Sequence, residues 1–286
     1  MNRSPLARSL LFVPGHQPRR VDKALASCAD AVIIDLEDAV PAADKRQARE
    51  AAADALGRRE AVFVRINGFD DPACFEDLEA IVRPGLAGVV LPKVEAAQPL
   101  ATIDWLVTQL ERRAGMEAGA VELLPLVETA RGVEALPQVA VASGRIRRLS
   151  FGVADYSLDL GVDVGPGEEA LSYIRSRLVH CSRAAGLEQP VDSVVVEVRD
   201  ADRFRESARR ARRLGLFGKL CIHPDQVPLA HEVFAPTAAE LARARAIVGA
   251  WESAGGRGEA AITVDGEFVD GPVAARARRI LSFGGG

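Results

Sequence analysis

The stretch Leu123–Val133, LLPLVETARGV, decides how the rest of the chain is interpreted. Its first five residues are apolar or proline, and then Glu128 and a turn follow. A short apolar run that ends in a turn predicts a buried parallel strand. A carboxylate at the end of such a strand must face a metal, an arginine or another cation, because burying an unpaired charge is costly.

A second copy of this pattern follows in LSFGVADYS, where the apolar run Leu149–Val153 precedes Asp155. Two carboxylates at the ends of successive buried strands predict a shared site for Mg²⁺, which prefers oxygen ligands and keeps several waters. No cluster of Cys or His that would favour zinc lies nearby. The alternative is that Glu128 and Asp155 form buried salt bridges with Arg65 and Arg131.

The composition indicates a soluble α/β protein. Of the 286 residues, 48% are hydrophobic but only 5% are aromatic, so the core must be aliphatic, as in parallel sheets. The net charge of −4 disfavours nucleic acid as a partner. No apolar run approaches the ~20 residues that span a membrane. The four cysteines are far apart without a CxxC pair, so neither a disulfide framework nor a zinc site is indicated, and we expect a cytoplasmic protein.

Short apolar runs alternate with helical segments along residues 1–235. The expected strands are Ser9–Val13, Ala31–Leu36, Val62–Ile66, Gly88–Pro92, Glu122–Val127, Arg148–Val153, Ser193–Val198 and Lys219–Ile222. The helical segments between them include Gln17–Ala29, Lys45–Ala55, Phe75–Val82, Ile103–Ala114 and Ala201–Leu214. This alternation predicts an α/β fold, a (β/α)8 TIM barrel that forms the catalytic domain. An open doubly wound sheet is the alternative, although no GxGxxG turn follows the first strand.

Residues 236–286 follow a different pattern and predict a C-terminal extension. Thr237–Trp251 reads as a helix that begins with an N-cap threonine. Ile262–Val269 alternates like a hairpin around Asp265-Gly266, and Pro272–Leu281 is helical again. Since this tail is too short for a core of its own, we expect it to pack on the barrel or on a neighbouring subunit.

In a barrel, the carboxyl ends of the strands gather at one mouth, where function resides. Arg65, at the end of VFVRING, is suited to grip a substrate carboxylate with two parallel hydrogen bonds, or it pairs with Glu37 or Asp38. Those two acids either accept hydrogen bonds from metal-bound waters or cap the following helix. Lys93 either binds a substrate carboxylate or pairs with Glu95.

Seven motifs in order complete the picture: RSLLFVPG, VIIDLEDAVP, VRING, LPKVE, LPLVETARG, FGVADYSLDLG and IHPDQV. Together they closely resemble the citrate lyase β-subunit-like group of acyl-CoA lyases. That group belongs to the aldolase/citrate lyase (HpcH/HpaI) superfamily of metal-dependent (β/α)8 barrels. The resemblance runs from Arg8 to about Val227 and resumes near the C-terminus.

The resemblance implies roles for individual residues. It implies Mg²⁺ ligation by Glu128 and Asp155, and binding of the keto-acid carboxylate by Arg65. It places the coenzyme A moiety near Phe12, Lys23, Ile222 and His223. Related malyl-CoA lyases have an arginine in the first loop where this chain has Gln17, and Arg19 or Arg20 is the expected replacement.

The C-terminal segment FVDGPV resembles the Asp-x-Pro element of the CoA-dependent lyases. The resemblance implies that Asp270 is the acid/base acting on the acetyl methyl group, often in a neighbour's active site within a trimer or hexamer. Asp265 is the local rival, but the hairpin turn accounts for it.

The expected reaction is therefore cleavage of a carbon–carbon bond in a β-hydroxyacyl-CoA of the citramalyl-CoA or malyl-CoA type. The products are acetyl-CoA and pyruvate or glyoxylate, and the reverse Claisen condensation is equally open. One alternative is a malyl-CoA thioesterase on the same scaffold. Another is a citryl lyase subunit that acts on a carrier-protein thioester. The sequence does not choose among the acyl groups, because one methylene changes discrimination by only ~1–3 kcal/mol.

Overall fold

The computed structural model describes residues 7–255 and 260–283. The chain divides into two compact units, Met1–His231 and Glu232–Gly286. Among the described residues, no helix combines the length and the apolar character needed to cross a membrane.

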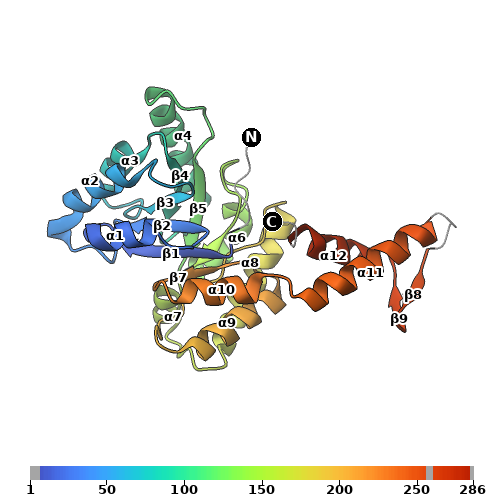
Figure 1. Ribbon diagram of the computed structural model, residues 1–286. Coiled ribbons are helices and arrows are strands. Elements are labelled where there is room, and N and C mark those ends of the chain that lie inside the picture. Colours follow the sequence, from blue (N-terminus) through green and yellow to red (C-terminus); the bar gives the residue numbers. More distant parts are fainter. Residues whose placement is uncertain (1–6, 256–259, 284–286) are drawn as a thin grey trace. The chain divides into compact units, whose positions relative to one another are not determined.

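The first unit is built on a curled sheet of seven parallel strands (Figure 1). In chain order the strands are β1 (Ser9–Pro14), β2 (Ala31–Asp35), β3 (Val62–Arg65), β4 (Leu86–Leu91), β5 (Glu122–Val127), β6 (Ser150–Phe151) and β7 (Lys219–Cys221). Their spatial order is β6-β5-β4-β3-β2-β1-β7, so each strand from β1 to β5 pairs with the next one along the chain, and β7 pairs with β1. This order places the carboxyl ends of all seven strands at one edge.

Helices follow the strands and surround the sheet (Figure 1). They are α1 (Pro18–Leu25), α2 (Lys45–Ala55), α3 (Ala73–Ile81), α4 (Ala97–Arg113), α5 (Ala130–Glu134), α6 (Leu136–Val139), α7 (Val153–Leu160), α8 (Ser172–Ala184), α9 (Ala201–Leu214) and α10 (Gln226–Phe234). The predicted helices Lys45–Ala55 and Ala201–Leu214 have the observed bounds.

The full eight-stranded barrel is not what the structure shows. The predicted strand Ser193–Val198 is irregular, and only its neighbour Asp192 forms an isolated parallel bridge, with Lys219. Three backbone hydrogen bonds hold the preceding residues, Val191 and Asp192, between β6 and β7. Val191 N–H donates to the carbonyl of Leu149, Asp192 N–H donates to Gly218, and Leu220 N–H donates to Asp192, at 2.8–3.0 Å. One bridge therefore stands where a strand was expected.

The sixth strand is also shorter than predicted. It spans Ser150–Phe151 rather than Arg148–Val153, because α7 begins at Val153 with Gly152 at its N-cap. Asp155 consequently lies in the first turn of a helix and not at the end of a strand. The helix dipole and the free N–H groups at that end favour a negative charge.

The interior of the sheet is aliphatic, as the composition indicates. Its buried members are Ala7, Leu10, Ala31, Ile33, Phe63, Val90, Leu124, Leu126, Val191 and Leu220. Phe12 and Val194 pack against this cluster from the edge where the strands end. The burial of each large aliphatic side chain contributes roughly 1.5–3 kcal/mol to stability. The floor beneath the strand ends is therefore an apolar, stably packed layer.

The second unit contains α11 (Ala238–Gly255), the hairpin strands β8 (Ile262–Val264) and β9 (Glu267–Val269), and α12 (Gly271–Phe283). Thr237 and Glu240 cap α11 reciprocally: each side chain accepts a hydrogen bond from the other residue's backbone N–H, at 3.1 and 2.8 Å. Asp265 and Gly266 have φ of 51° and 81°, the left-handed pair that a two-residue hairpin turn requires. The expected helices and hairpin of the tail are present. The expectation that the tail has no core of its own is wrong, because Ala244, Ile247, Val269 and Ala277 form a buried apolar cluster within it.

Candidate active site

A cavity of about 360 Å³ lies at the carboxyl ends of the strands. The residues that line it are Phe12, Val13, Pro14, Arg20, Asp35, Asp38, Ala39, Arg65, Leu126, Glu128, Gly152, Val153, Ala154, Asp155, Ser193, Val194, Leu220 and Ile222. Its floor is apolar, and its charged groups come from the ends of five different strands or from the segments that follow them. This is the arrangement in which barrel enzymes place their chemistry.

The charges around the cavity suit a divalent cation. Four carboxylates and two guanidinium groups line it, which leaves a net charge of minus two. Among the described residues, no salt bridge within 4.0 Å involves Glu128 or Asp155, and Arg131 instead lies 3.6 Å from Glu95. The predicted alternative, salt bridges to Arg65 and Arg131, is therefore wrong. The described residues contain no cluster of three or more candidate protein ligands, so water or substrate oxygens would complete the shell of a Mg²⁺ ion.

Glu128 is 2% exposed and follows directly on β5. Its Oε2 accepts a hydrogen bond of 2.8 Å from the backbone N–H of Lys93. Burial raises the pKa of Glu128 to about 7, although that hydrogen bond and the charge of Arg65 oppose the rise. The nearby charge of Asp155 adds to it. A cation beside this buried carboxylate would favour its ionised form.

The β5–β6 register explains how Glu128 meets α7. Val127 pairs with Phe151, so Glu128 and Gly152, each one residue further on, lie side by side. A Cβ atom at position 152 would lie 2.1 Å from Oε1 of Glu128. Only glycine leaves room for the carboxylate at the start of the helix that carries Asp155.

Arg65 is held from two sides. Its Nε and Nη2 donate to the two oxygens of Asp35 at 2.7 and 2.6 Å, and its Nη1 lies 2.9 Å from Glu37 Oε2. The register brings Arg65 opposite Asp35 on the neighbouring strand, and the guanidinium stacks 5.1 Å from the ring centre of Phe12. Burial alone would lower the pKa of Arg65, but the hydrogen bonds to Asp35 raise it. The guanidinium is thus fixed and charged, with N–H groups on Nη1 and Nη2 left for a ligand.

Lys93 connects the two groups of acids. Its Nζ lies 2.7 Å from Glu37 and 3.3 Å from Asp38, and not beside Glu95, as one prediction had it. Burial raises the pKa of Glu37. For Asp38, burial is opposed by the charges of Lys93 and Arg65 and by hydrogen bonds, which together lower the pKa. Whether Glu37 and Asp38 accept hydrogen bonds from metal-bound waters stays a prediction.

The backbone of Lys93 is left-handed, with a φ of 52°, and this conformation directs its N–H to Glu128. A residue with a Cβ atom is strained in this conformation. We therefore expect the free energy of unfolding of Lys93→Gly to be about 1 kcal/mol higher than that of Lys93→Ala. Both variants lack the ammonium group, so their difference isolates the backbone. Urea unfolding of the pair measures it, and an alanine variant as stable as the glycine variant would contradict the expectation.

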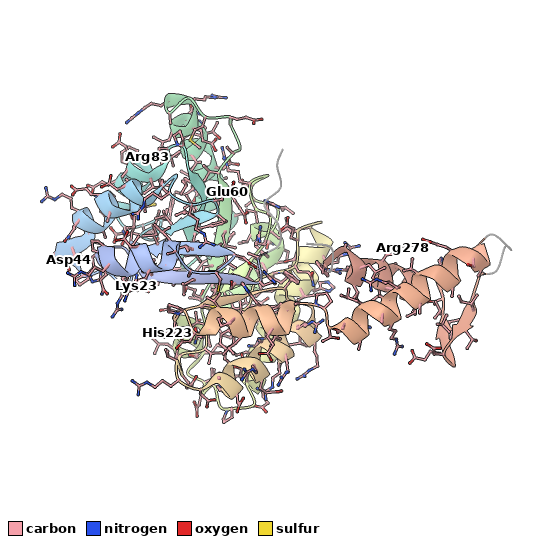
Figure 2. The ribbon with its side chains drawn as sticks, in the orientation of Figure 1. Lys23, Asp44, Glu60, Arg83, His223 and Arg278 are labelled. Carbon is pink, nitrogen blue, oxygen red and sulfur yellow. The ribbon has the colours of Figure 1, made fainter. Side chains whose placement is uncertain are left out.

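The residues predicted to contact coenzyme A fall into two groups. Phe12 and Ile222 line the cavity. Lys23 and His223 do not: Lys23 is exposed on α1, and His223, in the turn after β7, interacts with Asp225 (Figure 2). Since β1 and β7 are neighbours, the loops that follow them lie at adjacent positions on the rim. Contact of Lys23 and His223 with coenzyme A stays a prediction.

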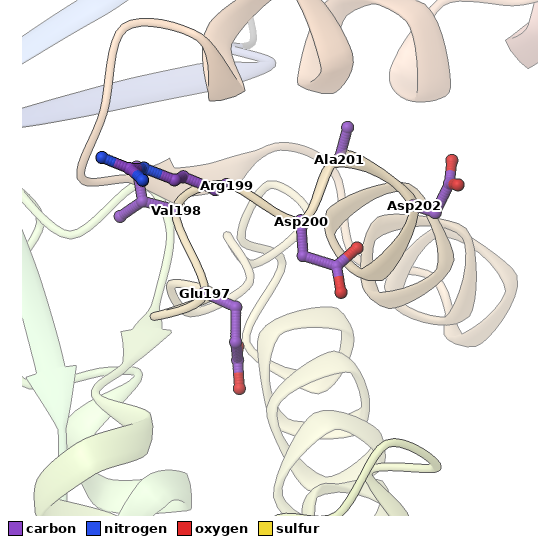
Figure 3. A pocket seen from close by; sticks show the side chains of 6 residues that line it. All are labelled: Glu197, Val198, Arg199, Asp200, Ala201 and Asp202. Carbon is purple, nitrogen blue, oxygen red and sulfur yellow. The ribbon is translucent and has the colours of Figure 1, made fainter.

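A second hollow lies along the turn Glu197–Asp202, whose six residues line it alone (Figure 3). Figure 3 shows the Arg199 side chain pointing away from the Glu197 carboxylate. Neither Glu197 nor Arg199 lines the cavity that contains Glu128. With side chains from one turn only, this hollow has no converging groups for chemistry.

Asp270 lies in the second unit, between β9 and α12. Its Oδ1 accepts a hydrogen bond of 3.1 Å from the N–H of Val273, so it caps α12. The acid/base role that the sequence predicts for Asp270 stays a prediction.

The sequence analysis gave no role to two cavity residues, Asp35 and Ser193. Asp35 ends β2 and is the partner of Arg65. Arg20 was named only as a replacement in the first loop, and it does line the cavity. Ser193 gave no signal, because its apolar surroundings suggest an ordinary strand.

Comparison with known proteins assigns the chain to a family. Residues 8–224 match the family described as HpcH/HpaI aldolase/citrate lyase. The chain belongs to the HpcH/HpaI aldolase/citrate lyase family. The predicted family is thus confirmed, and with it the prediction of an enzyme of the lyase class.

Three members of the HpcH/HpaI family illustrate its range. A citrate lyase subunit beta-like protein of Deinococcus radiodurans is 41% identical, with 99% of each chain covered. An L-malyl-CoA/beta-methylmalyl-CoA lyase of Cereibacter sphaeroides is 35% identical, with 92% of this chain and 90% of the relative covered. The structure of CitE from Mycobacterium tuberculosis in complex with magnesium, acetoacetate and coenzyme A is 30% identical, with a TM-score of 0.83 and coverage of 99% and 100%. The predicted cofactor, Mg²⁺, is the ion in that complex.

Proposed function

We propose that this protein is a Mg²⁺-dependent lyase that cleaves a β-hydroxyacyl-CoA to acetyl-CoA and an α-keto acid, or runs the reverse condensation. The proposal depends on two carboxylates, Glu128 and Asp155, that line the same cavity as the fixed guanidinium of Arg65. Among the described residues, neither carboxylate forms a salt bridge. CitE of M. tuberculosis, similar over its whole length, binds magnesium, a keto acid and coenzyme A together.

Glu128 and Asp155 would hold the metal, and Mg²⁺ bound there would act as a Lewis acid toward substrate oxygens. The free N–H groups of Arg65 would grip the carboxylate of the hydroxy acid. Phe12, on which Arg65 stacks, and the apolar floor would keep water from the reacting carbons. Held in this way, the substrate would present the bond between its hydroxyl-bearing carbon and the acetyl carbon for cleavage.

Cleavage then balances as follows. The hydroxyl loses its proton to water, and its electron pair forms the carbonyl of the keto acid. The carbon–carbon bond breaks, and its electrons pass to the acetyl thioester as an enolate. Asp270 would return a proton to the enolate carbon, and in the condensation direction it would remove that proton. The role of Asp270 rests on the motif FVDGPV.

The proposal is tested with purified protein, Mg²⁺, and malyl-CoA and citramalyl-CoA offered separately. Acetyl-CoA with glyoxylate or pyruvate is the expected result, and the faster substrate identifies the acyl group. Free coenzyme A with an intact hydroxy diacid would replace the lyase by the thioesterase. Turnover of neither compound would overturn the proposal.

A citryl lyase subunit is the second candidate, favoured by the 41% identity to the citrate lyase subunit beta-like protein of D. radiodurans. In that case the thioester would be carried by a partner protein, and the isolated chain would be inactive on coenzyme A esters. We also propose a homo-oligomer, a trimer or hexamer, which light scattering of the purified protein would establish.

Asp270→Asn is expected to lower the turnover by about 10²–10⁴-fold, the usual contribution of a positioned acid/base. Mg²⁺ binding should be unchanged. The sharper measurement is exchange of the acetyl-CoA methyl protons with deuterated water, which should stop in Asp270→Asn and continue in the control Asp265→Asn. If both variants exchange equally, Asp270 is only the cap of α12.

A further inference from the structure

A buried ion network occupies the place where the expected strand is missing. Asp192 and Lys219 are both 0% exposed, and the Lys219 Nζ donates to Asp192 Oδ2. Arg175, from α8, donates to both oxygens of Asp192 at 2.8 and 3.0 Å and to Glu168 at 2.8 Å. Ser207, from α9, accepts from Lys219 at 3.0 Å. Two cations and two anions are thus paired away from water.

Such a network is a poor source of stability. Withdrawing each ion from water costs several kcal/mol, and apolar side chains of the same volume often stabilise a protein equally well. We therefore interpret the ion network as a means of fixing a particular geometry. The segment it holds, Val191–Asp192, has only a single bridge and a few backbone hydrogen bonds to locate it between β6 and β7.

The network leads directly to the cavity. Asp192 pairs with Arg175 of α8, and the next residue, Ser193, lines the cavity. The Oγ of Ser193 accepts a hydrogen bond of 2.8 Å from the N–H of Val153, the first residue of α7. Asp155 lies two residues further along that helix, in its first turn.

We propose that the Asp192–Lys219–Arg175 network positions the carboxylate of Asp155, through Ser193 and the first N–H of α7. The proposal rests on the proposed function, because Asp155 matters as a metal ligand. It assigns Ser193, Asp192, Lys219 and Arg175 as positioning residues, none of them a metal ligand. The ion network stands where a strand was expected, and it fixes the position of the start of α7 relative to the cavity.

The first readout needs no metal. In the metal-free protein, the Val153 amide should exchange with deuterium about fivefold faster in Ser193→Ala than in the wild type, because the hydrogen bond is worth roughly 1 kcal/mol. Ser193→Thr, which keeps the oxygen, should restore protection. Unchanged exchange in Ser193→Ala would overturn the proposal.

The second readout is Mg²⁺ affinity by calorimetry. Ser193→Ala and Asp192→Asn should weaken binding about 10–100-fold, the range found when groups that orient a metal ligand are removed. Glu111→Gln is the matched control: Glu111 is 0% exposed and pairs with Arg145 at 2.6 Å, outside the cavity. It should lower the thermal midpoint as Asp192→Asn does and leave Mg²⁺ affinity unchanged.

Equal loss of affinity in Glu111→Gln would show a general effect of instability and overturn the proposal. Wild-type affinity in Ser193→Ala would overturn it too. If Asp192→Asn does not fold, Ser193→Ala still decides, because it leaves the ion network intact. A wild type that binds no Mg²⁺ would refute the proposed function and the metal part of this inference. The exchange of the Val153 amide, measured in Asp192→Asn as well as in Ser193→Ala, would then still show whether the network holds α7 through Ser193.

Discussion

Metal-free Glu128→Gln is expected to be more stable than the metal-free wild type at pH 8, by up to about 3 kcal/mol. Burial raises the pKa of Glu128 from the ordinary 4.5 to about 7, so the folded chain binds its proton more tightly than the unfolded chain does. The stability that this proton contributes is complete below 4.5 and is lost as the pH rises through about 7. At 1.36 kcal/mol per pKa unit, the loss is about 3 kcal/mol, which the neutral glutamine avoids.

The same substitution should remove the activity. Losing one of two charged ligands removes several kcal/mol of transition-state stabilisation, or about 10³-fold in turnover. Urea unfolding in EDTA at pH 4.5 and pH 8, with activity assays in Mg²⁺, measures both effects. The variant should gain its advantage only at the higher pH. The difference in free energy of unfolding between the variant and the wild type could instead be the same at both pH values. That result would show that Glu128 is not a strained buried carboxylate.

Gly152→Ala should damage the site without unfolding the protein. The added methyl would lie 2.1 Å from Oε1 of Glu128, the far end of a side chain, so the carboxylate must move and the backbone need not. We expect Mg²⁺ binding to weaken at least tenfold and kcat/KM to fall by about 10²-fold, since a shift of about 1 Å in a reacting geometry has that effect. The free energy of unfolding should change by no more than about 1 kcal/mol.

Gly144→Ala is the matched control, because a Cβ atom at position 144 meets no atom within 4 Å. It should behave as the wild type in metal binding and turnover. Full activity of Gly152→Ala would contradict the placement of Glu128 against the start of α7.

Much of the site could be predicted because its residues follow directly on strands. Glu128 ends an apolar run, and Arg65 ends another, so the topology alone brings them to one edge. Asp155 was placed correctly at the cavity but on the wrong element, since a strand of two residues leaves almost no pattern. The pairing of Arg65 with Asp35 depends on the register between strands, which a single sequence does not reveal.

The seventh expected strand, Ser193–Val198, was the clearest error, and its cause is physical. Ser193–Val198 is rich in β-branched residues, which suit a pleated surface, but strand formation needs a partner in register. Val196 is 59% exposed, and the position is held instead by the charges of Asp192 and Lys219. Asp192 and Lys219 are distant in sequence, and the residues around each of them do not predict that the two side chains pair.

The central claim is that a divalent cation and a keto acid bind together between Glu128, Asp155 and Arg65. Crystals soaked with Mn²⁺ and pyruvate, with data collected at an energy where manganese scatters anomalously, test it most directly. An anomalous peak within coordination distance of Glu128 and Asp155, with the pyruvate carboxylate on the free N–H groups of Arg65, is the predicted result. A cavity without the peak, or manganese bound elsewhere while pyruvate occupies the cavity, would contradict it.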